Sequence, residues 1–182
     1  MTLIFAILGS AQSLRATTLQ YYDLQELTER AEQVFVGTCT AMEGEQINGR
    51  IYTRVEFAVR DMVKGQPTER VTLYLLGGEY QGTRLQLAGM PTFEAEEDVV
   101  LFITARDALS RAWPVGLTQG KFRVEYRGAA KKAHISRNLG NVSLYPAAAK
   151  SVGSVTLDGM PLEDFLTRVR SFIQEEKTHD PH

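Results

Sequence analysis

The sequence predicts a mainly β, α+β domain in which five or six antiparallel strands curl into an open barrel between two helices. Apolar and polar residues alternate from Val34 to Val124 with the period of two that half-buried strands require. Glycine-rich turns interrupt this run, which is typical of tight turns and of the corners of curved sheets. Apolar residues then recur with helical spacing from Leu162 to Ile173.

The composition is that of an ordinary globular domain. The chain has 182 residues, of which 43% are hydrophobic and 23% are charged, both near the average for soluble proteins. Its net charge of -2 provides no broad basic field, so no nucleic-acid partner is predicted. No stretch beyond the N-terminus approaches the roughly 18 apolar residues of a membrane span. The composition leaves the oligomeric state open.

The first 16 residues have the pattern of a short secretory signal. The apolar stretch from Leu3 to Leu8 is followed by small and polar residues, and cleavage fits after Ala16 or after Ser13. No basic residue precedes the apolar stretch, so a buried N-terminal strand is the other interpretation. We therefore expect a signal peptide at 1–16, one domain at 17–176 and a polar tail at 177–182. An exported protein of this kind resides in the periplasm or outside the cell.

A short helix is expected to begin after Asp23 and to end near Glu32. Asp23 and Glu26 have the spacing of a capping box, in which each side chain accepts a hydrogen bond from the other residue's backbone N–H. Leu24, Leu27 and Ala31 fall on one face of this helix, which is therefore expected to pack against the sheet. The second helix is expected to start at Pro161.

The strands are expected between turn signals. Asn48-Gly49 is the dipeptide that most favours a tight hairpin turn, and it joins the first two strands. Continuous apolar character makes the segment from Val99 to Thr104 the predicted central strand. The predicted strands cover 34–42, 51–63, 70–76, 83–88, 99–104 and 119–126.

No arrangement of reactive groups predicts catalysis. Cys39 is the only cysteine, which excludes an intramolecular disulfide, and its place in an alternating strand favours a buried structural role. His134 is the only histidine outside the C-terminal tail. The acidic run from Glu94 to Asp98 is interpreted as a solvated bend. The sequence therefore predicts no catalytic residues, no metal site, no cofactor and no enzyme activity.

One surface is a candidate for binding. The segment from Gly77 to Gly82 carries three glycines, which let a partner approach the backbone closely, and aromatic residues nearby supply contact area. A sheet corner without a binding role is the other interpretation. The candidate binding residues are Gly77, Gly78, Tyr80, Gly82, Met90, Pro91, Phe93, Gln119 and Lys121.

Several phrases together resemble a family of uncharacterised bacterial exported proteins. They are Val36-Gly37, Gly49-Arg50-Ile51-Tyr52-Thr53, Val63-Lys64-Gly65, Gly77-Gly78, Gly89-Met90-Pro91-Thr92-Phe93, the strand at 99–102, and 116–122. The resemblance implies a β-barrel of the oligonucleotide/oligosaccharide-binding (OB) type. Its strand order is distantly similar to the netrin-type inhibitory module of tissue inhibitors of metalloproteases. Those inhibitors use an N-terminal cysteine, whereas the one cysteine here is Cys39.

These observations favour a non-catalytic, exported binding module of the bacterial envelope. Its expected partner is a protein or another envelope component, and no ligand is identified. The first alternative is an inhibitor of a secreted metalloprotease that acts without a cysteine. The second is an envelope hydrolase, which would require Glu79 and His134 to lie within hydrogen-bond reach in a concave pocket.

Overall fold

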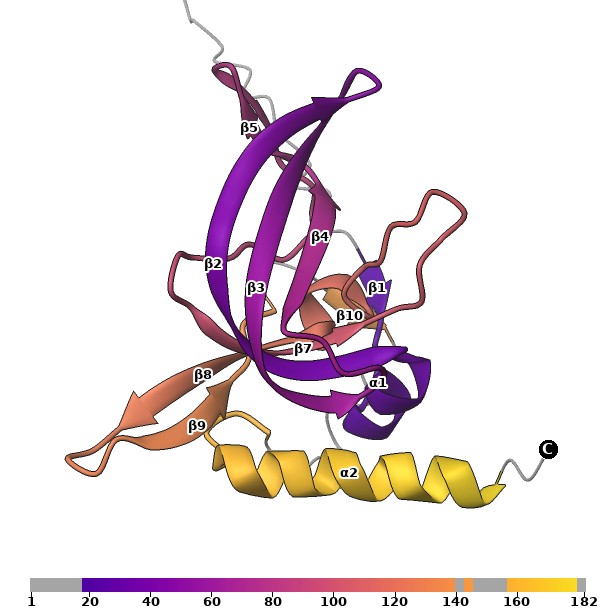
Figure 1. The fold of residues 1–182 in the computed structure, drawn as a ribbon, viewed down its shortest axis with the longest axis vertical. Coiled ribbons are helices and arrows are strands. Elements are labelled where there is room, and N and C mark those ends of the chain that lie inside the picture. The colour runs from indigo at the N-terminus through magenta and orange to yellow at the C-terminus, as the bar shows by residue number, and fades with distance from the viewer. Residues whose placement is uncertain (1–17, 140–142, 146–156, 180–182) are drawn as a thin grey trace, which may run out of the picture.

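A six-stranded antiparallel sheet dominates the fold. The computed structural model describes residues 18–139, 143–145 and 157–179 (Figure 1). The strands lie in the order β4-β3-β2-β7-β8-β9. Their bounds are β2 (Gln33–Ile47), β3 (Arg50–Lys64), β4 (Arg70–Leu76), β7 (Asp98–Ile103), β8 (Lys121–Arg127) and β9 (Lys132–Ser136). The prediction of a mainly β fold with an antiparallel sheet and two helices is confirmed.

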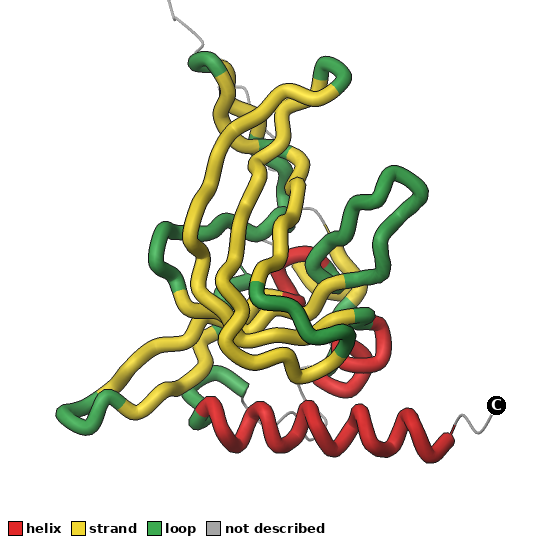
Figure 2. The backbone as a smooth tube through the Cα atoms, in the orientation of Figure 1, coloured by secondary structure: helices red, strands yellow, loops and turns green. Residues whose placement is uncertain are grey.

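The sheet curls without closing into a barrel. β2 and β3 form a long, bent ribbon that rises above the rest of the sheet (Figure 2). Register shifts at Val34/Phe35, Val36/Gly37 and Cys39/Ala41 interrupt the β2–β3 pairing, and such irregularities bend and twist a strand. Among the described strands, β4 pairs with β3 alone, so a closed barrel is not formed.

The predicted hairpin turn is present between β2 and β3. Asn48 and Gly49 have φ angles of 50° and 75°, the left-handed conformation that both central residues of this turn require. The pairing of Ile47 with Arg50 closes the turn. The dipeptide therefore sets the register of the two longest strands from the turn to the pairing of Ala41 with Glu56, beyond which the first register shift occurs.

The glycine-rich segment after β4 forms a small hairpin of β5 (Gly78–Tyr80) and β6 (Thr83–Leu85). This hairpin packs on β2 and β3. A Cβ atom on Gly44 of β2 would lie 1.7 Å from the backbone oxygen of Glu79, so only glycine lets the hairpin approach this closely. A separate pair of parallel strands joins β1 (Thr18–Gln20) to β10 (Ser143–Tyr145).

Two helices cover one face of the sheet. α1 (Leu24–Arg30) begins at Asp23 with the predicted capping box. α2 (Leu162–His179) runs beneath the sheet and continues three residues beyond position 176 (Figure 1). A short 3-10 helix, η1 (Leu117–Gly120), precedes β8. The predicted signal at 1–16 lies outside the described residues.

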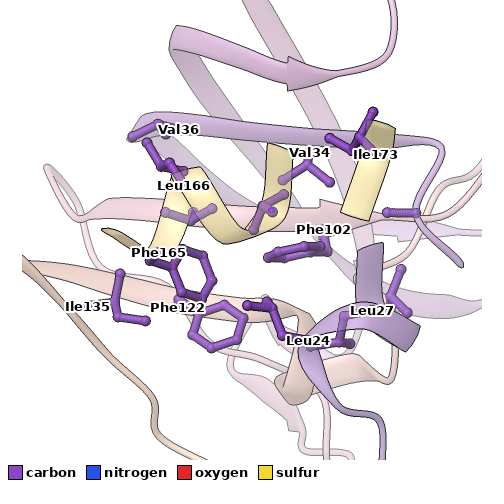
Figure 3. Close-up of a cluster of buried hydrophobic side chains, with 14 of the residues drawn as sticks. Leu24, Leu27, Val34, Val36, Phe102, Phe122, Ile135, Phe165, Leu166 and Ile173 are labelled. Atoms are coloured by element: carbon purple, nitrogen blue, oxygen red, sulfur yellow. The ribbon is translucent and has the colours of Figure 1, made fainter. Parts of the chain in front are cut away.

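Buried side chains form two cores on opposite faces of the sheet. The helix-side core contains the rings of Phe102, Phe122 and Phe165, which contact one another (Figure 3). The core in the concave face contains Phe57 with Phe35 and Phe93 around it, at centroid distances of 5.6 and 5.1 Å. Cys39 is fully buried there, in agreement with its predicted structural role.

Candidate functional site

An apolar groove of about 200 Å³ lies between the concave face of the sheet and the chain that follows β6. We call it the apolar groove. The sheet supplies its floor, which consists of Thr53, Val55, Leu75 and Leu76, with Gly77 and Gly78 at its end and the exposed Met42 at its mouth. Strand β6 and the chain after it supply its rim, which consists of Arg84, Leu85, Gln86, Leu87, Met90, Pro91, Thr92 and Phe93.

The two glycines shape the end of the groove. Gly77 and Gly78 have φ angles of 101° and 121°, a backbone conformation that favours glycine. A Cβ atom on Gly78 would lie 2.1 Å from Thr53 Oγ1. That hydroxyl donates a hydrogen bond of 2.8 Å to the carbonyl oxygen of Gly77. The glycines therefore let the chain turn from β4 into the β5–β6 hairpin while it stays against β3.

Five of the nine predicted binding residues line the apolar groove: Gly77, Gly78, Met90, Pro91 and Phe93. Phe93 is only 9% exposed, and its ring packs edge-on against Phe57. It therefore belongs to the inner wall of the groove and does not project toward a partner. Tyr80 and Gly82 lie in the hairpin beside the groove without lining it.

Gln119 lies inside the protein, away from the groove surface. Its side chain is fully buried. The amide nitrogen Nε2 donates to the carbonyl oxygen of Gln20 at 2.7 Å, and Oε1 accepts from the backbone N–H of Tyr22 at 2.9 Å. Gln119 thus fastens the segment between β1 and α1 to the start of β8.

Lys121 supports the rim of the groove from behind. Its Nζ donates to the carbonyl oxygen of Thr92 at 2.5 Å and lies 4.4 Å from the ring centroid of Phe93. Burial lowers the pKa of Lys121, while the hydrogen bond and the charge of Glu97 act in the opposite direction. Lys121 therefore positions two residues of the groove rim.

Glu97 is the partner that the sequence did not reveal. Its carboxylate accepts from Lys121 and from Arg123 Nε at 2.8 Å, and its side chain is 3% exposed. The prediction of a solvated acidic bend is therefore wrong for Glu97. One sequence feature could have indicated a buried carboxylate here: Lys121 and Arg123 alternate along one predicted strand, so both cations lie on the same face. The pattern does not show which acidic residue pairs with them.

The exposed apolar residues at the mouth of the groove were also missed. Met42 and Leu85 are 39% and 40% exposed. Leu85 falls in the predicted strand at 83–88, where alternation placed it on the same face as Leu87. The sequence offered no means to tell that this face borders a hollow.

The groove offers contact area and not acid–base chemistry. Among the described residues that line the groove, Arg84 is the only charged one. Glu79 lies in β5 and His134 in β9, at opposite ends of the molecule (Figure 1), so the pair that a hydrolase would require does not form. His134 Nδ1 instead lies 2.9 Å from the carbonyl oxygen of Lys132. Within the described ranges, no three His, Cys, Asp or Glu side chains converge on a possible metal position.

Comparison with known proteins gives no match: no protein-family model, no curated protein and no solved structure is significantly similar to this chain. The resemblance to exported bacterial proteins therefore stays a prediction. In the part of the chain that the structure describes, no helix is both long and apolar enough to cross a membrane.

Proposed function

We propose that this protein is a non-catalytic binding module whose apolar groove accepts an apolar side chain of a partner protein. The observation that carries the proposal is the convergence of five predicted binding residues on one preformed apolar hollow. Its volume of about 200 Å³ is below the roughly 300–1,000 Å³ of typical small-molecule sites. A single anchoring side chain fits this volume better than a whole cofactor does.

The mouth of the groove has the chemistry of a protein contact. Met42 and Leu85 present large apolar side chains to solvent, and apolar surface next to a hollow is typical of interaction sites. Methionines at 42 and 90 adapt their shape to an incoming side chain. Arg84 is exposed at the rim, where it is available to a carboxylate of the partner.

The groove is also held in place before a partner binds. Lys121 fastens Thr92, and Phe57 supports Phe93 on the inner wall. A second backbone hydrogen bond joins Thr118 N–H to the carbonyl oxygen of Gly89 at 2.9 Å. Such preorganisation lowers the entropy that binding costs.

The test is selection from a random peptide library displayed on phage, with the purified protein as the target. We expect enrichment of peptides that carry a large apolar residue. Leu85→Arg should abolish their binding because it places a charged, longer side chain at the mouth of the groove. Leu109→Arg is the matched control, because Leu109 is 68% exposed and lies outside the groove.

Two outcomes would contradict this function. The first is the absence of any enriched peptide. The second is enrichment of peptides that bind wild type, Leu85→Arg and Leu109→Arg equally. Circular dichroism of both variants controls for folding.

We further propose that the curled sheet is a partly open OB-like barrel. The order β4-β3-β2-β7-β8 and the gap between β4 and β8 support this assignment. Hydrogen bonds from Thr118 and Lys121 hold the chain from Leu87 to Phe93 on the β8 side of this gap. An experimental structure with the same strand order and the same gap tests it.

Export to the periplasm or beyond is proposed on the pattern of residues 1–16. N-terminal sequencing of protein from the periplasmic fraction tests it. The expected first residue is Thr17, or Leu14 if cleavage follows Ser13. An intact Met1 in that fraction would contradict cleavage.

Inhibition of a secreted metalloprotease is the second candidate function. The observation in its favour is the β8–β9 hairpin, which projects from the body of the molecule (Figure 1). Its tip carries Gly128 and Lys131, both with positive φ. The test is the rate of peptide cleavage by metalloproteases from the same envelope fraction. No slowing by the purified protein would rule this candidate out.

A further inference from the structure

The two outer strands of the sheet, β4 and β9, differ in whether another segment forms hydrogen bonds with their outer edge. The outer edge of β9 is covered by the chain before α2. Ile135 N–H donates to the carbonyl oxygen of Met160 at 2.9 Å, and Gly159 N–H donates to that of Ile135 at 2.8 Å. A bridge between His134 and Pro161 extends this contact. β9 therefore offers no open edge at these positions.

Among the described residues, the outer edge of β4 is capped at Arg70, where the Thr68 hydroxyl donates to the Arg70 carbonyl oxygen at 2.9 Å, and is uncovered at Thr72 and Tyr74. Glu69 and Gly77 flank β4, and both bond to β3: Val59 N–H donates to the carbonyl oxygen of Glu69, and Gly77 N–H donates to that of Ile51. The backbone groups of the odd-numbered residues of β4 therefore point toward β3. In an antiparallel pair, successive residues point their backbone groups in opposite directions. The N–H and C=O groups of Thr72 and Tyr74 therefore point away from β3. Among the described residues, none forms a hydrogen bond with these groups.

β4 also lacks the features that protect edge strands. Its sequence from Arg70 to Leu76 contains no lysine and no proline, and its pairing with β3 has no register shift. Val71, Leu73 and Leu75 fill the concave core, so no inward-pointing charge interrupts the edge. An edge of this kind is a template for the addition of another strand.

We propose that the β4 edge pairs antiparallel with β4 of a second copy of this chain, around a two-fold axis at Leu73. In this register Thr72 lies opposite Tyr74 of the second copy, and Arg70 lies opposite its Leu76. The outward backbone groups of Thr72 and Tyr74 in both strands then face each other, whereas the N–H and C=O of Arg70 stay bonded to the hydroxyl of Thr68.

The charge pattern of the strand favours a second copy over an unrelated peptide. The only charged residue from 70 to 76 is Arg70, and the two-fold register brings it against an uncharged residue, so no like charges face each other. Each contact also occurs twice, as in an isologous interface. The inference is independent of the apolar groove, because pairing uses the backbone of β4 and leaves Leu85 and Met42 at the groove mouth untouched.

The test is the mass of the purified protein in solution, measured by light scattering after size exclusion over a wide range of concentration. We expect a dimer for wild type and for Thr72→Ala, which keeps the backbone N–H. Thr72→Pro removes only an outward N–H, which an edge strand tolerates, and should halve the mass. A monomeric wild type, or a Thr72→Pro variant that stays dimeric, would overturn the proposal.

Amide hydrogen exchange of the wild-type protein tests the same pairing without a variant. The amides of Thr72 and Tyr74 should exchange more slowly as the protein concentration rises, because pairing protects them. Leu85→Arg should leave this protection unchanged, which separates the edge from the groove. Fast exchange at Thr72 and Tyr74 at every concentration would overturn the pairing even if the protein forms a dimer.

Discussion

Lys121 and Glu97 form an ion pair at 2.8 Å in which the two side chains are 14% and 3% exposed. This pair links β8 to the end of the chain that crosses the concave face, since Lys121 also donates to the carbonyl oxygen of Thr92. The pair lies behind the groove rim. Lys121 and Glu97 therefore hold the rim in position without lining the groove themselves.

Glu97→Ala should destabilise the protein by about 3–5 kcal/mol, because it leaves Lys121 without its carboxylate partner in a buried position. Equilibrium unfolding in urea measures the change. Glu94→Ala is the matched control: Glu94 is 72% exposed and pairs with Arg123 at 3.1 Å, so its loss should cost under about 1 kcal/mol. A similar change in the free energy of unfolding for the two variants would contradict a larger contribution from the buried Glu97 pair.

Gln119→Ala should release the segment between β1 and α1. It leaves the N–H of Tyr22 and the carbonyl of Gln20 without partners, each at a cost of about 1–3 kcal/mol. Hydrogen exchange should become faster at Tyr22 while the amides of β7 keep their protection. Gln119→Glu keeps the acceptor for Tyr22 and should lose less protection there than Gln119→Ala. Unchanged exchange in both variants would contradict the clamp.

Asp98 should make stability depend on pH in acid. Burial alone raises the pKa of this carboxyl, but hydrogen bonds from Thr38, Tyr126 and Arg60 outweigh it and hold the pKa below its usual range. Its contribution is therefore present above the unfolded pKa of about 3.9 and is lost as pH falls through the folded value. Asp98→Asn should cost about 1.5–3 kcal/mol at neutral pH.

The measurement for Asp98 is a set of urea unfolding curves from neutral to strongly acid pH. Wild type should lose more stability than Asp98→Asn as pH falls below about 4. Parallel curves for the two proteins would show that Asp98 does not carry this dependence.

Gly44→Ala should detach the β5–β6 hairpin from the sheet. The added Cβ would collide with the backbone oxygen of Glu79, and overpacking of this kind costs about 1–3 kcal/mol. The control is Gly82→Ala in the same hairpin, where a Cβ meets no atom within 4 Å and only the φ of 76° is strained. Thermal unfolding compares them. A larger loss of stability in Gly82→Ala would contradict the packing described for Gly44.

Local patterns predicted most of the elements. The alternation between 70 and 76 matches β4 residue for residue, and the Asn48-Gly49 signal gave the right turn because its conformation depends on two residues alone. The Asp23 capping box held for the same reason. β2 and β3 extend to Ile47 and Arg50, beyond their predicted ends, because pairing with each other stabilises polar residues that the apolar pattern did not include.

Contacts between distant segments could not be predicted. Gln119 and Lys121 flank Gly120, which predicts an accessible turn, yet their partners Gln20 and Glu97 hold both side chains inside the protein. Phe93 became part of a core because the sheet curls far enough to bring Phe57 to it. No local pattern encodes these distances, so the sequence pointed to five residues of the groove without indicating which of their side chains are buried.

The most direct test of the binding function is a nuclear magnetic resonance titration of methyl-labelled protein with an apolar peptide selected on phage. Peptide binding in the groove should shift the methyl signals of Met42, Leu85 and Met90, which line it. The methyl groups of Ile47 and Leu109, exposed elsewhere, should not shift. Shifts confined to Ile47 or Leu109, or no shifts at saturating peptide, would contradict the assignment of the groove as the binding site.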